Sequence, residues 1–305
     1  MLRYLMQRIG LALLVCVAVS LLAFTLLNAS GDVAISVAGE EATAAQIDAI
    51  REQMGLNRPL LVRYGEWLGN AVQGDFGNSL FFRQPVGELI ADRLPKTMTL
   101  AVMSLAVMLL LSVPLGVVAA LRPNSLIDRA ALLIAVLGQA MPNFWFALVL
   151  IVIFSLTLGI MPPSGSATLK HYVLPAIALG YYSTPPMMRL IRQGMIEALS
   201  SDYIRTAQAK GIGATKIIFK HALRNAVIPV VSLSAVQFGN MLGGSVVIEA
   251  VFGINGLGFL AWESISRMDL PVVQAVLLIV AVFYIIVVLA ADFINAWLDP
   301  RIRIS

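Results

Sequence analysis

The chain contains six long runs of mainly apolar residues, and this pattern constrains its fold more than any other feature. Each run is close to the about 20 apolar residues that an α-helix needs to cross a bilayer. We expect spans at residues 9–28, 98–121, 130–160, 173–190, 226–251 and 272–294. A chain of 305 residues that is 59% hydrophobic is also more apolar than a soluble domain. The sequence therefore predicts an all-α membrane protein with six transmembrane helices.

Three of these spans carry further signals. Arg3 and Arg8 precede the first span, as they would in a secretory signal peptide. Its apolar core is longer than the about 7–15 residues of a signal peptide, so we interpret it as a retained anchor. Pro142 predicts a kink in the third span, and Pro175 with the Thr184-Pro185-Pro186 run predicts an irregular fourth span.

The basic residues of the short loops predict the orientation. They gather at both ends of the chain, between spans two and three, and between spans four and five. These residues are Arg3, Arg8, Arg122, Arg129, Arg189, Arg192, Arg205, Lys210, Lys216, Lys220, Arg224, Arg301 and Arg303. The loops after spans three and five hold only Lys170 and Arg267. Because basic loops stay inside, we expect both termini to be cytoplasmic.

The domain organisation follows from this topology. Residues 1–28 form the cytoplasmic N-terminus and first span, and residues 29–97 form a small extracytoplasmic (periplasmic) loop subdomain. That loop shows helical patterns at 42–54 and 60–72, separated by Asn57-Arg58-Pro59. Residues 98–294 form a five-helix core that includes a cytoplasmic loop at 194–225. Residues 295–305 form a cytoplasmic tail.

The sequence offers little chemistry for catalysis or for a metal site. Its two histidines, His171 and His221, lie at loop edges, and neither a His-x-x-x-His nor a Cys-x-x-Cys pair is present. There is no G-x-x-x-x-G-K-[ST] loop, and we interpret "GINGLG" (253–258) as a turn rather than a dinucleotide site. We therefore expect no catalytic residue, no bound metal and no cofactor on this chain. The net charge of +4 fits loop topology better than nucleic-acid binding.

The middles of the spans offer neutral polar side chains rather than charges. Gln139 and Asn143 lie in the third span, and Gln237 and Asn240 lie in the fifth. One interpretation is that they line a path for a polar solute. The other is that they form hydrogen bonds that hold helices together. Both interpretations remain open.

A basic segment at residues 203–229, "YIRTAQAKGIGATKIIFKHALRNAVIP", separates the fourth and fifth spans. Asp202 is expected to cap a short helix that Gly211 ends in a left-handed conformation. Thr215 is expected to cap a second helix that leads into the fifth span. The segment would then be a rigid cytoplasmic knob, although a basic loop resting on anionic lipid fits its composition equally well.

The residues of this segment resemble a known family. "RTAQAKG" (205–211) is similar to the E-A-A-x-x-x-G loop of membrane permease subunits of binding-protein-dependent ABC importers, with Ala207 on the second alanine and Gly211 on the glycine. Arg205 replaces the glutamate and Thr206 the first alanine, as in the dipeptide/oligopeptide/nickel group. "GDFGNSL" (74–80) and "IEAVFGINGLG" (248–258) also resemble that group, although Asn255 stands where proline is common.

The resemblance implies a function and a set of partners. The chain would form half of a translocation pathway with a second, homologous permease subunit, as a heterodimer in a bacterial or archaeal cell membrane. Two ATP-binding cassette subunits would carry ATP and Mg, and a periplasmic or lipid-anchored binding protein would deliver the substrate. The residues implied to couple to the ATPase are Tyr203, Arg205, Thr206, Ala207, Lys210, Gly211 and Thr215. Dipeptides, oligopeptides, glutathione-like compounds and nickel chelates remain open as substrates.

Two other functional classes are alternatives to the importer. An ion-coupled secondary transporter or channel would act without an ATPase, and it usually places charged residues at membrane depth. An intramembrane enzyme would need a catalytic pair, for which no histidine is available in the spans.

Overall fold

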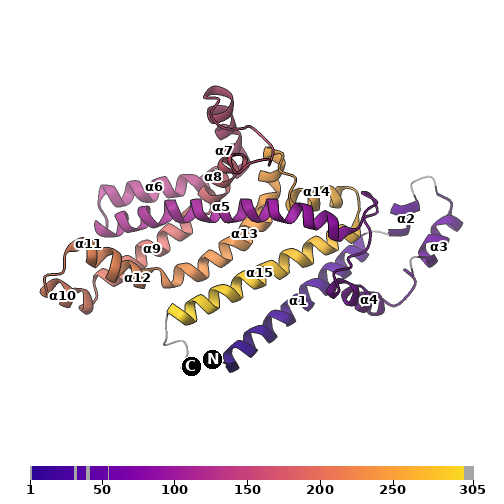
Figure 1. Ribbon diagram of the computed structural model, residues 1–305, viewed down its shortest axis with the longest axis horizontal. Helices are drawn as coiled ribbons and strands as arrows, with labels where there is room; N and C mark the ends of the chain where they lie inside the picture. The colour runs from indigo at the N-terminus through magenta and orange to yellow at the C-terminus, as the bar shows by residue number, and fades with distance from the viewer. Residues whose placement is uncertain (1, 31–32, 39–41, 54, 299–305) are drawn as a thin grey trace. The chain divides into compact units, whose positions relative to one another are not determined.

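The computed structural model describes residues 2–30, 33–38, 42–53 and 55–298. Over these residues the secondary structure is helical, apart from one isolated bridge between Asn78 and Pro85 (Figure 1). The chain divides into two compact units, residues 1–96 with 256–285 and residues 97–255 with 286–305. Arg301 and Arg303 of the predicted tail lie outside the described residues.

The first unit is built around the start of the chain. Its helices are α1 (Leu2–Ser30), α2 (Val33–Ala38), α3 (Ala44–Gln53), α4 (Leu60–Val72), the start of α5 (Val86–Leu121), α14 (Leu257–Ser266) and most of α15 (Leu270–Leu298). Helices α3 and α4 confirm the two helical patterns predicted in the first loop.

Two apolar clusters hold the first unit together. Phe24 of α1 packs edge-on against Tyr64 of α4, with ring centroids 5.6 Å apart, and the Tyr64 hydroxyl lies 2.7 Å from Ser20 Oγ. A second cluster joins the start of α5, α14 and the start of α15, with Val86, Leu260 and Val272 fully buried. Burying such side chains away from water stabilises the fold by up to about 1.5–3 kcal/mol each, and by less where lipid would otherwise cover them.

The second unit holds the rest of the chain. It contains the remainder of α5, α6 (Leu126–Ala140), α7 (Asn143–Leu150), the π-helix η1 (Ile151–Thr157), the 3-10 helix η2 (Leu169–Tyr172), α8 (Val173–Tyr182), α9 (Thr184–Leu199), α10 (Asp202–Ala209), α11 (Ala214–Lys216), the π-helix η3 (Ile217–Ala222), α12 (Leu223–Ala226), α13 (Ile228–Phe252) and the end of α15.

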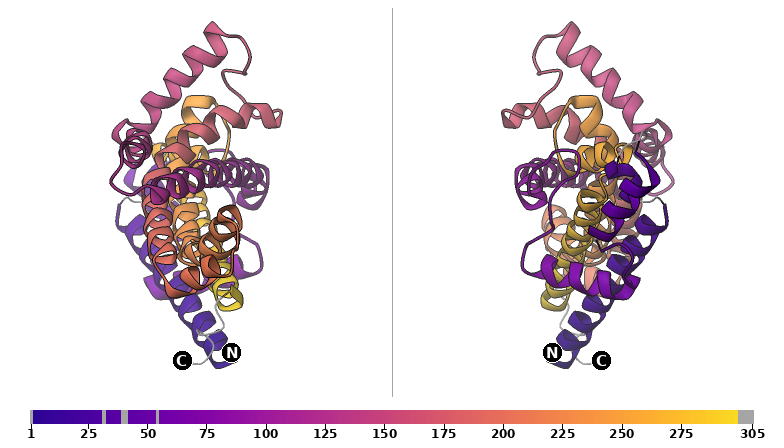
Figure 2. Two further views of the ribbon diagram at one scale, coloured as in Figure 1. Left: turned by 90° about the vertical axis from the view of Figure 1, so that its left-hand side faces the viewer. Right: turned by 90° about the vertical axis from the view of Figure 1, so that its right-hand side faces the viewer.

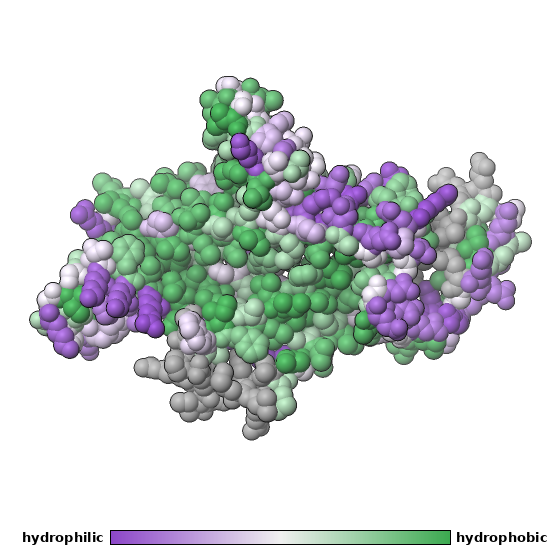
Figure 3. Space-filling view, in the orientation of Figure 1, coloured by the Kyte–Doolittle hydropathy of each residue, from purple (hydrophilic) through white to green (hydrophobic). Residues whose placement is uncertain are grey.

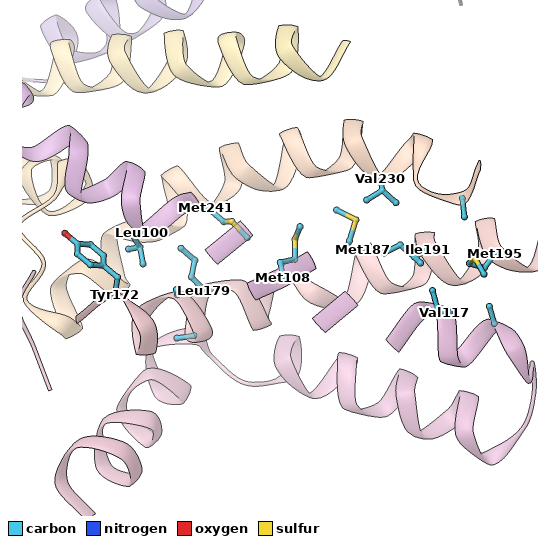
Figure 4. Close-up of a cluster of buried hydrophobic side chains, with 14 of the residues drawn as sticks. Leu100, Met108, Val117, Tyr172, Leu179, Met187, Ile191, Met195, Val230 and Met241 are labelled. Carbon is cyan, nitrogen blue, oxygen red and sulfur yellow. The ribbon is translucent and has the colours of Figure 1, made fainter. Parts of the chain in front are cut away.

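The core of the second unit runs between α5, α8, α9 and α13. Figure 4 shows Met108, Leu179, Met187, Ile191 and Met241 lying between these helices. All five are almost completely buried. Flexible methionines fill the irregular gaps between closely packed helices.

Glycines permit the closest of these approaches. A Cβ at Gly180 of α8 would lie 2.5 Å from the Ser104 carbonyl oxygen of α5, and one at Gly116 of α5 would lie 2.8 Å from Ile191 of α9. Small residues are common where helices meet in membranes, because they let the backbones approach. Both glycines are therefore required by packing rather than by backbone conformation.

Within the part of the chain that the structure describes, four helices are long and apolar enough to cross a membrane. They cover Met6–Leu26 in α1, Val86–Leu121, Ile228–Phe252 and Leu270–Trp297. A fifth candidate is the pair formed by α6 and by α7 with η1, which bends by 100°. The predicted fourth span forms two shorter helices, α8 and α9, which meet at Ser183.

The break between α6 and α7 confirms the kink predicted at Pro142. Helix α6 ends at Ala140, Met141 and Pro142 are extended, and α7 begins at Asn143. Figures 1 and 2 show α7 and η1 turned away from the line of α6. The bend separates two otherwise continuous apolar helices.

Helix α5 begins earlier than the sequence predicted. It starts at Val86 and continues through Pro95, whereas the span was expected to start near residue 98. Lys96 forms an ion pair with Asp92, one turn before it, at 2.9 Å. Helix α5 therefore includes a charged first part and an interior proline before its long apolar run.

Candidate functional site

The basic segment begins with a short helix whose start differs from the prediction. Ser201 takes the extended cap conformation, and Asp202 is already the first residue of α10. Asp202 instead forms an exposed ion pair with Arg205 at 3.3 Å. The predicted cap at Asp202 is therefore wrong by one residue, since either residue type favours this position.

Helix α10 ends in a Schellman motif. Gly211 has a φ of +70°, its N–H donates to Gln208 O at 2.9 Å, and the Ile212 N–H donates to Ala207 O at 3.2 Å. These two bonds satisfy carbonyls that would otherwise lack partners at the helix end. The predicted left-handed stop at Gly211 is confirmed. A Cβ at Gly211 would meet no atom within 4 Å, so the requirement for glycine in this chain is conformational.

The next helix also starts differently from the prediction. Gly213 takes the cap conformation without any side-chain hydrogen bond, and α11 begins at Ala214. Thr215 lies inside that helix and is exposed, so it does not act as the predicted cap. The chain then passes through the π-helix η3 and α12 to α13.

The two faces of α10 differ in burial. Ile204 and Ala207 are buried in the core of the second unit. Four of the predicted coupling residues on α10 and at its end are exposed: Tyr203, Arg205, Thr206 and Lys210. In Figure 3 hydrophilic residues gather over the part of the second unit where α10 lies. The helix is therefore fixed from one side and presents a polar, basic surface on the other.

A hydrogen bond holds α10 to the chain that follows it. Asn225 Nδ2 of α12 donates to the Tyr203 hydroxyl at 2.8 Å. Helix α12 in turn packs against α9, because a Cβ at Gly194 would lie only 3.2 Å from Ala226. The basic segment is thus a folded element joined to its neighbours rather than an extended loop.

The four predicted path residues fall into two pairs. Asn240 Nδ2 donates to Gln237 Oε1 at 3.1 Å, with Gln237 buried and Asn240 exposed on α13. Gln139 and Asn143 flank the break between α6 and α7, where Gln139 is exposed and Asn143 is half-buried. The Gln237–Asn240 bond lies within one helix, so it does not by itself hold two helices together.

Three carboxylates with defined partners were not singled out by the sequence. Asp128 of α6 is 2% exposed and accepts hydrogen bonds from Arg192 Nε at 2.7 Å and Arg192 Nη2 at 2.6 Å. Hydrogen bonding to Asp128 raises the pKa of Arg192 above its usual value, which favours the charged form that arginine already has at physiological pH. The two residues are 64 positions apart, and only their charges could have suggested the pair.

The second carboxylate, Glu249, is fully buried near the end of α13. It accepts a hydrogen bond from Thr97 Oγ1 at 2.7 Å. Glu249 lies near the end of the predicted span 226–251, and its side chain is enclosed by protein. A buried carboxylate needs hydrogen-bonding partners of this kind.

The third carboxylate, Asp269, organises a turn in the first unit. It is fully buried and accepts hydrogen bonds from Ser79 Oγ at 2.5 Å, Leu80 N at 3.1 Å and Phe81 N at 3.2 Å. The Arg267 guanidinium stacks 3.9 Å from the centre of the Phe81 ring. The "GDFGNSL" motif is therefore fixed to the turn that precedes α15.

Comparisons with known proteins place the whole chain in one family. The description "Binding-protein-dependent transport system inner membrane component" matches residues 112–304, and its N-terminal counterpart matches residues 1–101. The chain is 40% identical over 304 residues to the "Glutathione transport system permease protein GsiC" of Escherichia coli strain K12, covering 99% of each chain. It is equally similar to the protein of that name from Shigella dysenteriae serotype 1.

Solved structures agree with this assignment at the level of fold. A chain of the inward-facing MetNI methionine ABC transporter matches with a TM-score of 0.57 and 19% identity, covering 69% of this chain and 96% of that one. A second crystal form of the same transporter gives a TM-score of 0.54. The chain belongs to the family of binding-protein-dependent transport system inner membrane components and is a permease subunit of an ABC importer.

Proposed function

We propose that this permease subunit couples to its ATPase partners through residues 203–215, which we call the coupling segment. The observation that carries this proposal is the build of α10, whose Schellman end and buried Ile204 and Ala207 fix it to the second unit. Its opposite face leaves Tyr203, Arg205, Thr206 and Lys210 exposed. An element that transmits a displacement must keep its shape, and a loop resting on lipid needs no such fixation.

We propose the following assembly and topology for the importer. The chain crosses the membrane six times with both termini in the cytoplasm, and residues 29–97 lie outside. It pairs with a second, homologous permease subunit, with two ATP-binding cassette subunits below and a binding protein above. The distribution of basic residues in the short loops supports this orientation. Alternating access would follow from movement of the two permeases relative to each other.

We propose glutathione or a peptide of similar size as the substrate. The support is the printed name of the relatives, which are 40% identical over the whole chain. Gln237 and Asn240, both neutral and polar on α13, fit a polar solute better than an apolar one. They are our candidates for the translocation path, together with Gln139 and Asn143.

The test is transport by the complete complex in proteoliposomes. With the binding protein loaded with reduced glutathione, ATP hydrolysis and glutathione uptake should rise together. Gly211→Asp and Ala207→Glu should reduce ATPase co-purification and uptake. The Lys210→Gln, Lys216→Gln double variant should have a small effect, because exposed ion pairs contribute only about 0–1 kcal/mol.

Two results would contradict this proposal. If both small-residue variants keep the ATPase and uptake while the lysine double variant loses them, the segment acts as a basic surface and not as a shaped coupling element. Uptake by this chain alone, without ATP, would instead favour an ion-coupled transporter or channel.

A further inference from the structure

We propose that the Asp128–Arg192 ion pair is a positioning pair that makes α6 move as one body with the coupling segment. Through it, a displacement at α10 would reach the bend at Met141 and Pro142 and so reorient α7. This inference rests on the proposed coupling function and adds the route by which motion crosses the second unit.

The start of α6 is fixed to α9 by this pair. Both Asp128 oxygens accept from Arg192, at 2.7 and 2.6 Å, and Asp128 Oδ2 also accepts from the Asn124 N–H at 2.8 Å. Ser125 Oγ caps the same helix by accepting from the Asp128 N–H. The turn itself contains Asn124 at a φ of +62°, a conformation that surrounding contacts must hold in place.

The other end of α6 is fixed to α8. The Tyr181 hydroxyl donates to the Ile134 carbonyl oxygen at 2.5 Å. A Cβ at Gly138 would lie 2.6 Å from the Tyr181 carbonyl oxygen, so the two backbones are in close contact there. The contacts of α6 with α9 near its start and with α8 in its second half therefore restrain both translation and rotation of α6 relative to these helices.

Helix α9 connects these contacts of α6 to the coupling segment. It follows α8 after Ser183, and two residues, Ser200 and Ser201, separate its end from the start of α10. Close packing at Gly194 and Ala226 joins α9 to α12, and Asn225 of α12 holds Tyr203 of α10. Helices α6, α8, α9, α10 and α12 thus form one connected group within the second unit. Helix α7 follows the extended residues Met141 and Pro142 and also contacts the group through Phe146, whose ring centroid lies 5.4 Å from that of Tyr181.

The geometry of the pair suits a mechanical role. A bidentate arginine–carboxylate contact fixes direction as well as distance, whereas lysine makes a point contact. Asp128 is almost completely buried, so removing its partner leaves a charge that water cannot solvate well. The nearby Arg189, on the same helix, is exposed and has no such geometry to lose.

The test compares Arg192→Lys with Arg189→Lys in the reconstituted complex. Both variants keep the charge, and only the first loses the two-point contact. We expect Arg192→Lys to assemble and to hydrolyse ATP within about twofold of wild type, with glutathione uptake per ATP lowered about tenfold, which is within the usual range of coupling between sites. Arg189→Lys should leave this ratio unchanged.

A distance measurement provides a readout that does not depend on substrate. Spin labels at Gln208 of α10 and Thr157 of η1, both exposed, can be introduced as cysteines in a Cys16→Ala background. In the wild-type complex the label distance should differ between the nucleotide-free and ATP-bound states. In Arg192→Lys this difference should shrink or the distance distribution should broaden.

The outcomes separate the inference from the proposed function. If the wild-type complex shows no binding-protein-stimulated hydrolysis, the coupling proposal itself fails. If wild type is coupled and Arg192→Lys keeps a wild-type uptake per ATP, the inference is overturned. A parallel loss of hydrolysis and uptake in a complex that still assembles would show a purely structural role and would also overturn it. If Arg192→Lys fails to assemble, glutathione uptake per ATP is measured instead for Tyr181→Phe, which removes the hydrogen bond between α8 and α6.

Discussion

At the residue scale, Gly211 shows how a single backbone conformation defines the coupling segment. The chain leaves the right-handed helix within one residue, and two backbone hydrogen bonds close the end of α10 behind it. Because the space around Gly211 is open, the cost of a side chain in this subunit is that of holding it at a φ of +70°.

This gives a graded prediction at position 211. Gly211→Ala should destabilise the end of α10 by about 1 kcal/mol, and Gly211→Asn should cost less because asparagine tolerates the left-handed region. Uptake per ATP should therefore follow the order glycine, asparagine, alanine. Equal coupling for all three would mean that the left-handed stop has no functional role.

The pair Gln237 and Asn240 gives a second prediction at this scale. Gln237→Leu removes a buried polar group and its bond to Asn240, whereas Asn240→Leu changes an exposed position on the same face. If they line the path, both should lower glutathione uptake while the complex purifies at a normal yield. Loss of assembly would indicate a role in helix association, and intact uptake and assembly in both variants would exclude both roles.

The sequence predicts the helix stop at a glycine but not the exact helix caps or the long-range ion pair. The glycine stop could be predicted because few other residues adopt that conformation. The caps could not be placed, since Ser200, Ser201 and Asp202 are all good capping types and only the backbone selects Ser201. Asp128 and Arg192 were visible as charges near span ends, but a contact across 64 residues depends on how α6 packs against α9.

At the scale of elements, one proline marks a break between helices and another lies inside a helix. Pro142 correctly indicated a break, although the angle of 100° is set by packing that the sequence does not reveal. Pro95 lies inside α5, ahead of residue 98, where the second span was expected to start. The local pattern could not show that Val86 and Ile90 bury against α14 and α15 and so extend the helix.

Asp269 leads to a prediction about the turn at residues 79–85. This carboxylate accepts three hydrogen bonds from the turn, whereas asparagine could keep only part of this arrangement and alanine none. Asp269→Ala should loosen the turn and speed cleavage after the exposed Arg83 by trypsin. The exposed Lys210, where α10 ends, is the internal control, and an unchanged cleavage ratio between the two sites would refute the prediction.

At the scale of the whole molecule, the exposed apolar surface agrees with a membrane protein. Leu14, Leu26, Leu110, Leu133 and Leu156 are each more than half exposed, on α1, α5, α6 and η1. Such surfaces are stable only against lipid or another apolar helix. Composition predicted this much, because 59% hydrophobic residues cannot be enclosed by a chain of this length.

The number of spans is harder to predict from composition than the membrane class of the protein. Apolar length predicted the long helices α1, α5, α13 and α15 well. The predicted span at 173–190 instead divides at Ser183 into α8 and α9, each shorter than a bilayer-crossing helix. Six crossings and the orientation of the loops therefore remain predictions.

Thiol labelling checks the orientation directly. Asn57 and Asn78, both exposed in the first unit, should react from outside the cell with a membrane-impermeant reagent when changed to cysteine in a Cys16→Ala background. A cysteine at Gln208 should react only after the cells are opened. The reverse pattern would invert the whole topology, and with it the assignment of α10 to the ATPase side.

The π-helix η3 sets an angular relation that substitutions alone would not reveal. It places Ile217–Ala222 between the coupling segment and α13, and a π-turn holds one residue more than an α-turn. Each residue of a regular α-helix turns the chain by about 100°, so a deletion in α13 would rotate α10 by about that angle, whereas deleting one residue within η3 would let the helix become regular and leave the direction of α10 nearly unchanged. The π-helix is therefore the place between the coupling segment and α13 where the chain could lose a residue and still face its partner in the same direction.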